Sequence, residues 1–251
     1  MLAEWLTSLV TPCDPAVRRL GYLHELIAIR ARHGRCAPAW AGHIAACRAF
    51  VDERAPGGDL AVVVGAGLCL DVPLDLLTAR YRRVVRFDLC FLGRQRGVEQ
   101  RFFDVTGGVR TWARWPQDDP RTALVDPGWP TDLPAPDLVL SANLMTQLHL
   151  FPEQWLRPHH PGVDLADACA RLHLGWLARR PGVRLLIADV EERVLDAQGA
   201  LACRLPTSAR LLPPPLRTWT WDLAPQGEHD PDHALQRLVG AWDQNSFDSF
   251  L

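Results

Sequence analysis

The sequence predicts an α/β protein with a mostly parallel β-sheet, an N-terminal helical layer and an antiparallel hairpin at the C-terminal end. Short apolar runs alternate with helical segments after residue 58, which is typical of parallel strands covered by helices on both faces. The first run breaks into a Gly-Ala-Gly turn and the second ends on an aspartate. Helical periodicity precedes these runs, and alternation with period two follows residue 216.

Residues 1–55 are predicted to form helices that belong to the same domain as the sheet. Asp14 can cap a helix that has Pro15 in its first turn, and apolar residues then recur at helical spacing. A second helix is predicted from Pro38 to Glu53, and a Pro-Gly-Gly sequence ends the layer. This layer is therefore expected to cap the sheet domain.

Residues 56–251 are predicted to form the rest of the domain. A helix is predicted from Leu165 to Arg180, and residues 217–222 are expected to pair with 235–242 as a hairpin at one edge. Trp219 and Trp221 would share one face of that hairpin. Five buried strands are expected at 60–65, 83–88, 99–104, 137–142 and 183–189.

Composition excludes several classes of function. The 251 residues carry a net charge of -2 with a pI near 6.5, so no basic face for nucleic acid is expected. No apolar run reaches about 18 residues, so no membrane partner is predicted. The seven cysteines are scattered without a Cys-x-x-Cys pair, which favours reduced thiols in a cytoplasmic protein. No metal site is predicted, because His159-His160 lacks a carboxylate or cysteine at ligand spacing.

The glycine turn after the first strand carries the functional signal. Asp88 follows Gly67 by 21 residues, close to the roughly 20-residue spacing that pairs a glycine turn with a ribose-binding acid. Glycine lets the backbone approach a ligand closely, and a carboxylate can accept two hydrogen bonds from a ribose diol. This pattern indicates an adenosine-containing cofactor.

Three features together resemble the class I S-adenosylmethionine-dependent methyltransferases: this glycine turn, Asp88, and Asp104 at the end of the next strand. Residues 136–147 are similar to that family's fourth strand and the substrate-facing loop after it. The whole chain also resembles a little-described group of bacterial methyltransferase-like proteins, through three motifs at residues 70–74, 141–144 and 219–228. The resemblance implies a Rossmann-like, seven-stranded sheet with an antiparallel final strand, and S-adenosylmethionine as the cofactor.

The resemblance also implies which residues bind that cofactor. Backbone at the glycine turn would face the methionine end, Asp88 would bind the ribose hydroxyls, and Asp104 would bind the adenine amino group. Two positions depart from the family: Val63 replaces a frequent acid, and Cys69 replaces the third glycine of the turn. The expected cofactor site comprises Gly65, Ala66, Gly67, Asp88, Leu89, Asp104, Val105 and Ser141.

The catalytic candidates follow the fourth strand, on the side where open sheets bind ligands. His149 is the expected acid–base residue, and Asn143 and Gln147 are polar candidates in the same loop. The N-terminal helices are expected to pack near this loop and shape the acceptor site. Asp71, two residues before Pro73, is predicted to be a helix cap.

The favoured function is methyl transfer to an unidentified small-molecule acceptor. A catalytically idle methyltransferase-like binding or assembly protein is the alternative, which Val63 and Cys69 favour. An NAD-dependent oxidoreductase is disfavoured, because Leu70 stands where the Gly-x-Gly-x-x-Gly pattern needs a small residue. A homodimer or a protein partner is left open.

Overall fold

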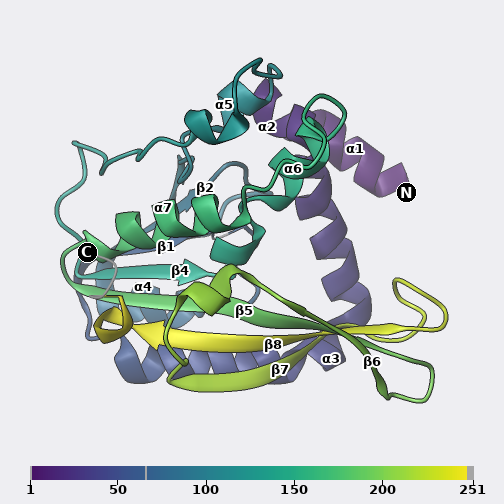
Figure 1. Cartoon of the computed structure of the whole chain (residues 1–251). Coiled ribbons are helices and arrows are strands. Elements are labelled where there is room, and N and C mark those ends of the chain that lie inside the picture. Colours follow the sequence, from purple (N-terminus) through teal and green to yellow (C-terminus); the bar gives the residue numbers. More distant parts are fainter. Residues whose placement is uncertain (1, 66, 248–251) are drawn as a thin grey trace.

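The computed structural model describes residues 2–65 and 67–247 (Figure 1). One sheet has the order β3-β2-β1-β4-β5-β8-β7, with β6 paired to β5 outside this path. The strands are β1 Gly58–Val64, β2 Tyr81–Asp88, β3 Val98–Phe102, β4 Leu138–Ala142, β5 Val183–Leu195, β6 Leu201–Pro206, β7 Arg217–Ala224 and β8 Ala234–Asp243.

The sheet confirms the expected direction of its strands. β1 to β5 pair in parallel, whereas β8 is antiparallel to both β5 and β7. Each of the five expected strands and the hairpin is found. The sequence did not predict β6 or the extension of β5 to Leu195. All six residues of β6 are exposed, so no buried face marks that strand in the sequence.

Helices cover both faces of the sheet. Within the described residues, no helix combines the length and apolar character needed to cross a membrane. Short 3₁₀ helices lie at Pro120–Ala123, Met145–Gln147, Ser208–Leu211 and Gln244–Ser246. The α-helices are α1 Leu2–Val10, α2 Pro15–Leu20, α3 Tyr22–Arg54, α4 Leu74–Arg80, α5 Val109–Trp112, α6 Leu150–Leu156 and α7 Ala166–Ala178.

The expectation of a separate helix from Pro38 to Glu53 is wrong, because α3 is one helix of 33 residues with Pro38 inside it. Proline removes one backbone N–H and usually kinks or ends a helix. Here the chain buries apolar side chains on both sides of the proline, Leu26 before it and Phe50 after it. The helix break lies instead at Gly21, whose φ of 99° separates α2 from α3.

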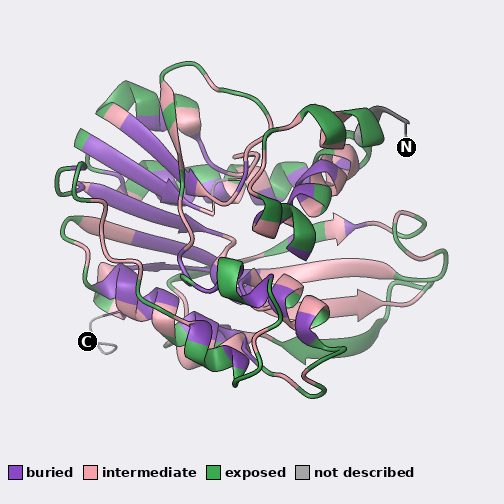
Figure 2. Cartoon of the chain, turned by 90° about the horizontal axis from the view of Figure 1, so that it is seen from above, coloured by how far each residue is buried: buried purple, intermediate pink, exposed green. Residues whose placement is uncertain are grey.

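Alternate residues of each central strand enter two different hydrophobic cores. Val62 and Val64 of β1 pack in one core with α7, and Ala61 and Val63 pack in the other. These strands are buried on both faces (Figure 2). The first turns of α3 join the core on the α7 side, and its later turns join the other. α3 therefore passes the carboxyl edge of the sheet, where the expected site lies.

Candidate functional site

A cleft of about 840 Å³, including the part open to solvent, lies at the carboxyl ends of β1 to β4. It lies where the strand order reverses, between β1 and β4, which is where open α/β sheets bind ligands. Residues expected from the sequence that line it are Gly65, Gly67, Asp88, Leu89, Asp104, Val105, Asn143 and Gln147. Ala66 lies outside the described residues.

The two described glycines of the turn have different structural needs. Both have positive φ, 74° at Gly65 and 39° at Gly67. A Cβ at Gly65 would lie 2.5 Å from the Cβ of Leu144, so glycine is required there for close packing against the β4 loop. A Cβ at Gly67 would meet only the Leu26 side chain at 3.4 Å and the Asp88 carboxylate at 3.9 Å. Gly67 is the residue of the pair that borders free space in the cleft.

The carboxylate of Asp88 holds this turn. One of its oxygens accepts the N–H of Gly67 and the other accepts the N–H of Leu89, each at 2.6 Å. Burial raises the pKa of Asp88, although these backbone hydrogen bonds oppose the shift. Each carboxylate oxygen offers two acceptor sites, so both oxygens can still bind a ligand hydroxyl.

Asp104 also borders the cleft, but it organises its own loop. One oxygen accepts from the N–H and the hydroxyl of Thr106, at 2.9 and 2.6 Å. The other accepts from the N–H of Val109, at 2.9 Å, at the start of α5. Leu89 and Val105 line the cleft beside the two acids. A structural role for Asp104 is thus established by its contacts, and one acceptor site on its second oxygen is left for a ligand.

Two expected site residues lie away from the cleft. Ser141 is fully buried and its hydroxyl bonds Nε2 of His173 at 2.8 Å, so its assignment to the cofactor site is corrected. His149 does not line the cleft but a second cavity next to it. Burial lowers the pKa of His149, and its Nδ1 has no hydrogen-bond partner in the described structure. The His149 ring therefore could act on a ligand only from that second cavity.

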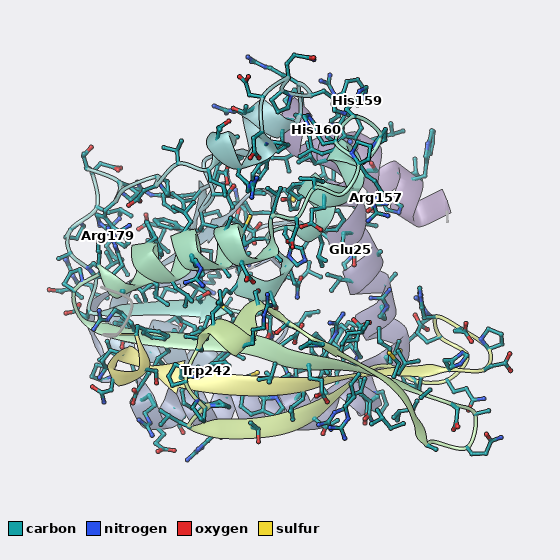
Figure 3. All side chains as sticks on the ribbon, viewed as in Figure 1. Glu25, Arg157, His159, His160, Arg179 and Trp242 are labelled. Atoms are coloured by element: carbon teal, nitrogen blue, oxygen red, sulfur yellow. The ribbon has the colours of Figure 1, made fainter. Side chains whose placement is uncertain are left out.

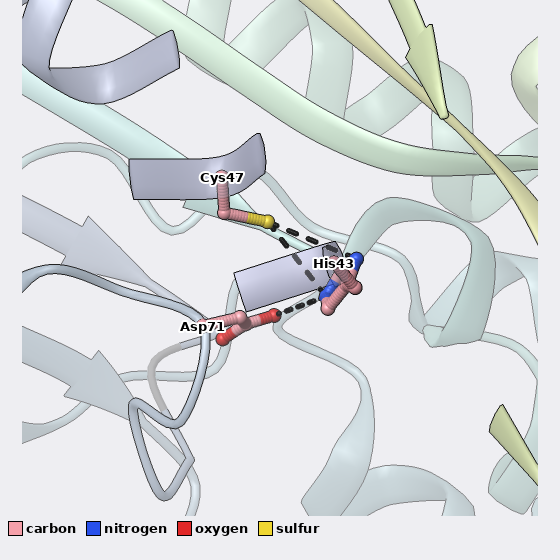
Figure 4. Close-up of side chains that lie close together, drawn as sticks. All are labelled: His43, Cys47 and Asp71. Carbon is pink, nitrogen blue, oxygen red and sulfur yellow. Dashed lines mark hydrogen bonds and ion pairs between the residues drawn. The ribbon is translucent and has the colours of Figure 1, made fainter. Parts of the chain in front are cut away.

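Asn143 belongs to a series of hydrogen-bonded side chains that the sequence did not reveal. The indole N–H of Trp219 donates to Nδ1 of His43 at 2.9 Å. Nε2 of the same ring lies 3.4 Å from Asp71, and Figure 4 shows His43 and Asp71 facing each other. Asp71 also accepts from the Asn143 amide. Since an indole N–H only donates, His43 must carry its proton on Nε2 and donate it to Asp71. Asp71 is thus not the expected helix cap: Pro73 occupies the cap position of α4.

The same series of hydrogen bonds orients the amide of Asn143. Because its NH2 group faces Asp71, its Oδ1 points away, and this buried oxygen has no hydrogen-bond partner in the described structure. Burial alone would raise the pKa of Asp71, but the hydrogen bonds from His43 and Asn143 outweigh it and lower that pKa. Asn143 has a φ of 47°, a strained conformation for a non-glycine residue. An unsatisfied, strained polar group beside a cleft is a candidate ligand contact.

His43, Cys47 and Asp71 lie close enough to suggest a metal site. The hydrogen bond from Trp219 opposes this function, because it places the proton on the nitrogen that would bind the metal. A metal-bound histidine instead donates its other ring N–H to a neighbouring group. Burial also raises the pKa of the Cys47 thiol, which disfavours the thiolate that a metal requires. The cluster fits a hydrogen-bonded support for Asn143 better than a metal centre.

The second cavity, of about 1470 Å³ including its open part, adjoins the cleft. It lies between α3, the start of α6, and the strands β5 to β8. Both are lined by Glu25, Ile29, Gln147 and Phe151. The first turns of α3 thus border the cleft near Asn143 and Gln147, as expected, while its later turns pack on the sheet. Glu25 was missed because no local motif marks a residue that only the fold brings to the site.

The fold and the site together define a Rossmann-like α/β protein. Its open sheet is mostly parallel with an antiparallel β8, and the glycine turn after β1 is held by the acid that ends β2. No family model and no curated protein matches the sequence.

Solved structures similar to this chain include the 23S rRNA methyltransferase ErmE, at 10% identity and a TM-score of 0.32 over 76% of this chain and 66% of that one. The chain thus spans just under two thirds of ErmE's length. Glycopeptide N-methyltransferase MtfA complexed with S-adenosyl-L-methionine is 13% identical, with a TM-score of 0.30 over 78% and 93% of the two chains. Precorrin 8w decarboxylase of Methanobacterium thermoautotrophicum is 13% identical, with a TM-score of 0.30 over 78% of this chain and 88% of that one. Similarities this distant carry no functional argument.

Proposed function

We propose that the cleft binds S-adenosylmethionine and that the protein transfers its methyl group to a small molecule. The observation that carries this proposal is the pairing of the glycine turn with Asp88. Its carboxylate fixes the backbone of Gly67 and keeps acceptor capacity for a ribose diol. Leu89 and Val105 offer apolar surface for the adenine ring, and Asp104 keeps one acceptor site for the adenine amino group.

The residues present fit this cofactor. The backbone at Gly67 borders the cleft with little in its way, which suits close approach of the methionine end. When bound, the cofactor supplies a sulfonium-activated methyl group. The chain would then have to align the acceptor and exclude water, which can provide much of the rate. The first turns of α3, with Tyr22 and Leu26 in the cleft wall, cover the site for this purpose.

Asn143 would contact a ligand through Oδ1. Its amide is held by Asp71, which is held in turn by His43 and Trp219, so the direction of the free oxygen is set before any ligand binds. Such preorganisation lowers the entropic cost of binding. Asn143 is therefore proposed as a ligand-orienting residue, and His149 as a group of the second cavity.

The alternative is a methyltransferase-like protein without turnover. It is favoured by the contacts of Asp104, whose carboxylate already accepts three hydrogen bonds from its own loop and α5. Calorimetric titration with S-adenosylmethionine, S-adenosylhomocysteine and NAD separates these functions. Binding of the first two without NAD supports the proposal. If neither S-adenosyl compound binds, the non-catalytic function is favoured.

A further inference from the structure

The second cavity contains buried polar groups that lack hydrogen-bond partners. Thr146, Asp189, Ser208 and Trp221 are at most 8% exposed and each lines the cavity. The hydroxyls of Thr146 and Ser208, Oδ1 of Asp189 and the indole N–H of Trp221 have no partner among the described residues. An unsatisfied buried group costs about 1–3 kcal/mol, so several in one cavity indicate a polar ligand.

Two opposite charges on α3 lie apart along this cavity. Glu25 lies where the cavity meets the cleft, and Arg32 lines the cavity seven residues, about 10 Å, further along α3. Glu25, labelled in Figure 3, makes no side-chain hydrogen bond or ion pair within the described structure. Arg237 lines the cavity from β8, where its guanidinium pairs with Glu192 at 2.5 Å and lies 3.9 Å from Asp189. Nε of Arg32 lies 3.9 Å from the Glu228 carboxylate and has no hydrogen-bond partner among the described residues.

The apolar part of the wall includes three aromatic side chains beside aliphatic ones. Trp40, Phe151 and Trp221 line the cavity, and the ring centroids of the two tryptophans lie 4.9 Å apart in an edge-on arrangement. Aromatic walls suit a planar ring, and guanidinium groups suit a carboxylate. A carboxylate at the Glu25 end would be repelled, so a bound anion would place its opposite end at the junction with the cleft.

We propose that this cavity is the methyl-acceptor site and that it takes an aromatic carboxylic acid bearing a hydroxyl or amino group. The inference rests on the proposed function. The acid group lies at Arg32, and the hydroxyl or amine lies at Glu25. A lone pair of that hydroxyl oxygen or amine nitrogen forms the bond to the methyl carbon. At the same time the sulfur–carbon bond breaks and its electron pair stays on sulfur. The proton of the nucleophile goes to the Glu25 carboxylate.

The binding test uses named pairs of probes: 4-hydroxybenzoate, 3,4-dihydroxybenzoate and 4-aminobenzoate, each against its carboxamide. Calorimetry is run on the protein alone and on the protein saturated with S-adenosylhomocysteine. At least one acid should bind at least about tenfold more tightly than its amide, a difference of about 1.4 kcal/mol. Arg32→Gln should remove this preference. The control Arg30→Gln changes an exposed arginine of the same helix and should keep it.

The transfer test uses the acid that binds. Glu25→Gln should leave its affinity within about threefold and lower kcat by about 10²–10⁴, the usual contribution of general acid–base catalysis. Glu53→Gln, at the far end of α3, is the matched control. Equal binding of acids and amides, no binding by any acid, or an unchanged preference in Arg32→Gln would overturn the ligand class. An unchanged kcat in Glu25→Gln would overturn its role. Titration with S-adenosylhomocysteine alone decides the proposed function separately.

Discussion

The backbone N–H of Gly67 donates to the carboxylate of Asp88 at 2.6 Å, which joins two residues 21 positions apart. This bond ties the loop after β1 to the end of β2. The same carboxylate accepts the N–H of Leu89, so one side chain fixes the backbone on two sides of the cleft. Asp88 thus supports the turn as well as offering itself to a ligand, and its substitution tests both roles.

Asp88→Ala should weaken S-adenosylhomocysteine binding by roughly 10- to 150-fold, because a hydrogen bond to a charged group contributes about 1.5–3 kcal/mol. Calorimetry measures the dissociation constant. Thermal unfolding is followed in parallel, since the variant also loses the support for Gly67. A folded variant that binds with wild-type affinity would contradict the ribose assignment.

Gly65→Ala and Gly67→Ala should separate structural from binding roles. Alanine at 65 would overlap Leu144 and lie 3.0 Å from the carbonyl oxygen of Ala142, so unfolding free energy should fall by several kcal/mol. Alanine at 67 meets only flexible side-chain atoms and pays mainly for its positive φ, about 1–2 kcal/mol. Urea denaturation measures the stability of both variants. For the same loss of stability, Gly67→Ala should lose more ligand affinity than Gly65→Ala. Equal destabilisation by the two variants would refute this distinction.

Acid should destabilise the protein through His173. Burial lowers the pKa of this histidine to about 4, against 6.5 for an exposed one. The unfolded chain therefore binds more protons between pH 6.5 and 4, so stability is retained above 6.5 and lost as the pH falls toward 4. The total loss of unfolding free energy through His173 is about 3 kcal/mol.

Urea denaturation across pH 4–8 measures this effect, and His173→Gln should flatten the profile in that window. His24→Gln, at an exposed position of α3, controls for the substitution itself. A His173→Gln profile as steep as that of the wild type would show that other groups cause the acid sensitivity.

The ring proton of His43 should be on Nε2, because the indole N–H of Trp219 donates to Nδ1. Nitrogen NMR of histidine-labelled protein distinguishes the two tautomers. Trp219→Phe removes the donor, so the Nε2-protonated form should no longer be the only one observed. A wild-type ring protonated on Nδ1 would contradict the orientation deduced for Asn143.

Local pattern was sufficient for much of the fold. Period-two burial and apolar runs located the central strands, and glycine turns and caps located several boundaries. Strand β6 was not predicted because it has no buried face. Helix α3 was predicted as two helices because the rule that proline ends a helix considers only neighbouring residues. Packing on both sides of Pro38 decides that case, and packing depends on residues distant in the sequence.

The sequence by itself determined the glycine turn, the acids at the ends of β2 and β3, and the direction of the sheet, because these follow from neighbouring residues and strand order. Only the tertiary structure decided that Ser141 is buried against His173, that Asp71 holds Asn143 rather than a helix end, and that Glu25 lies where the cleft meets the second cavity. Hydrogen bonds between side chains 32 or 72 residues apart leave no periodic trace in the chain. They form only when the sheet and α3 bring those residues to the same edge.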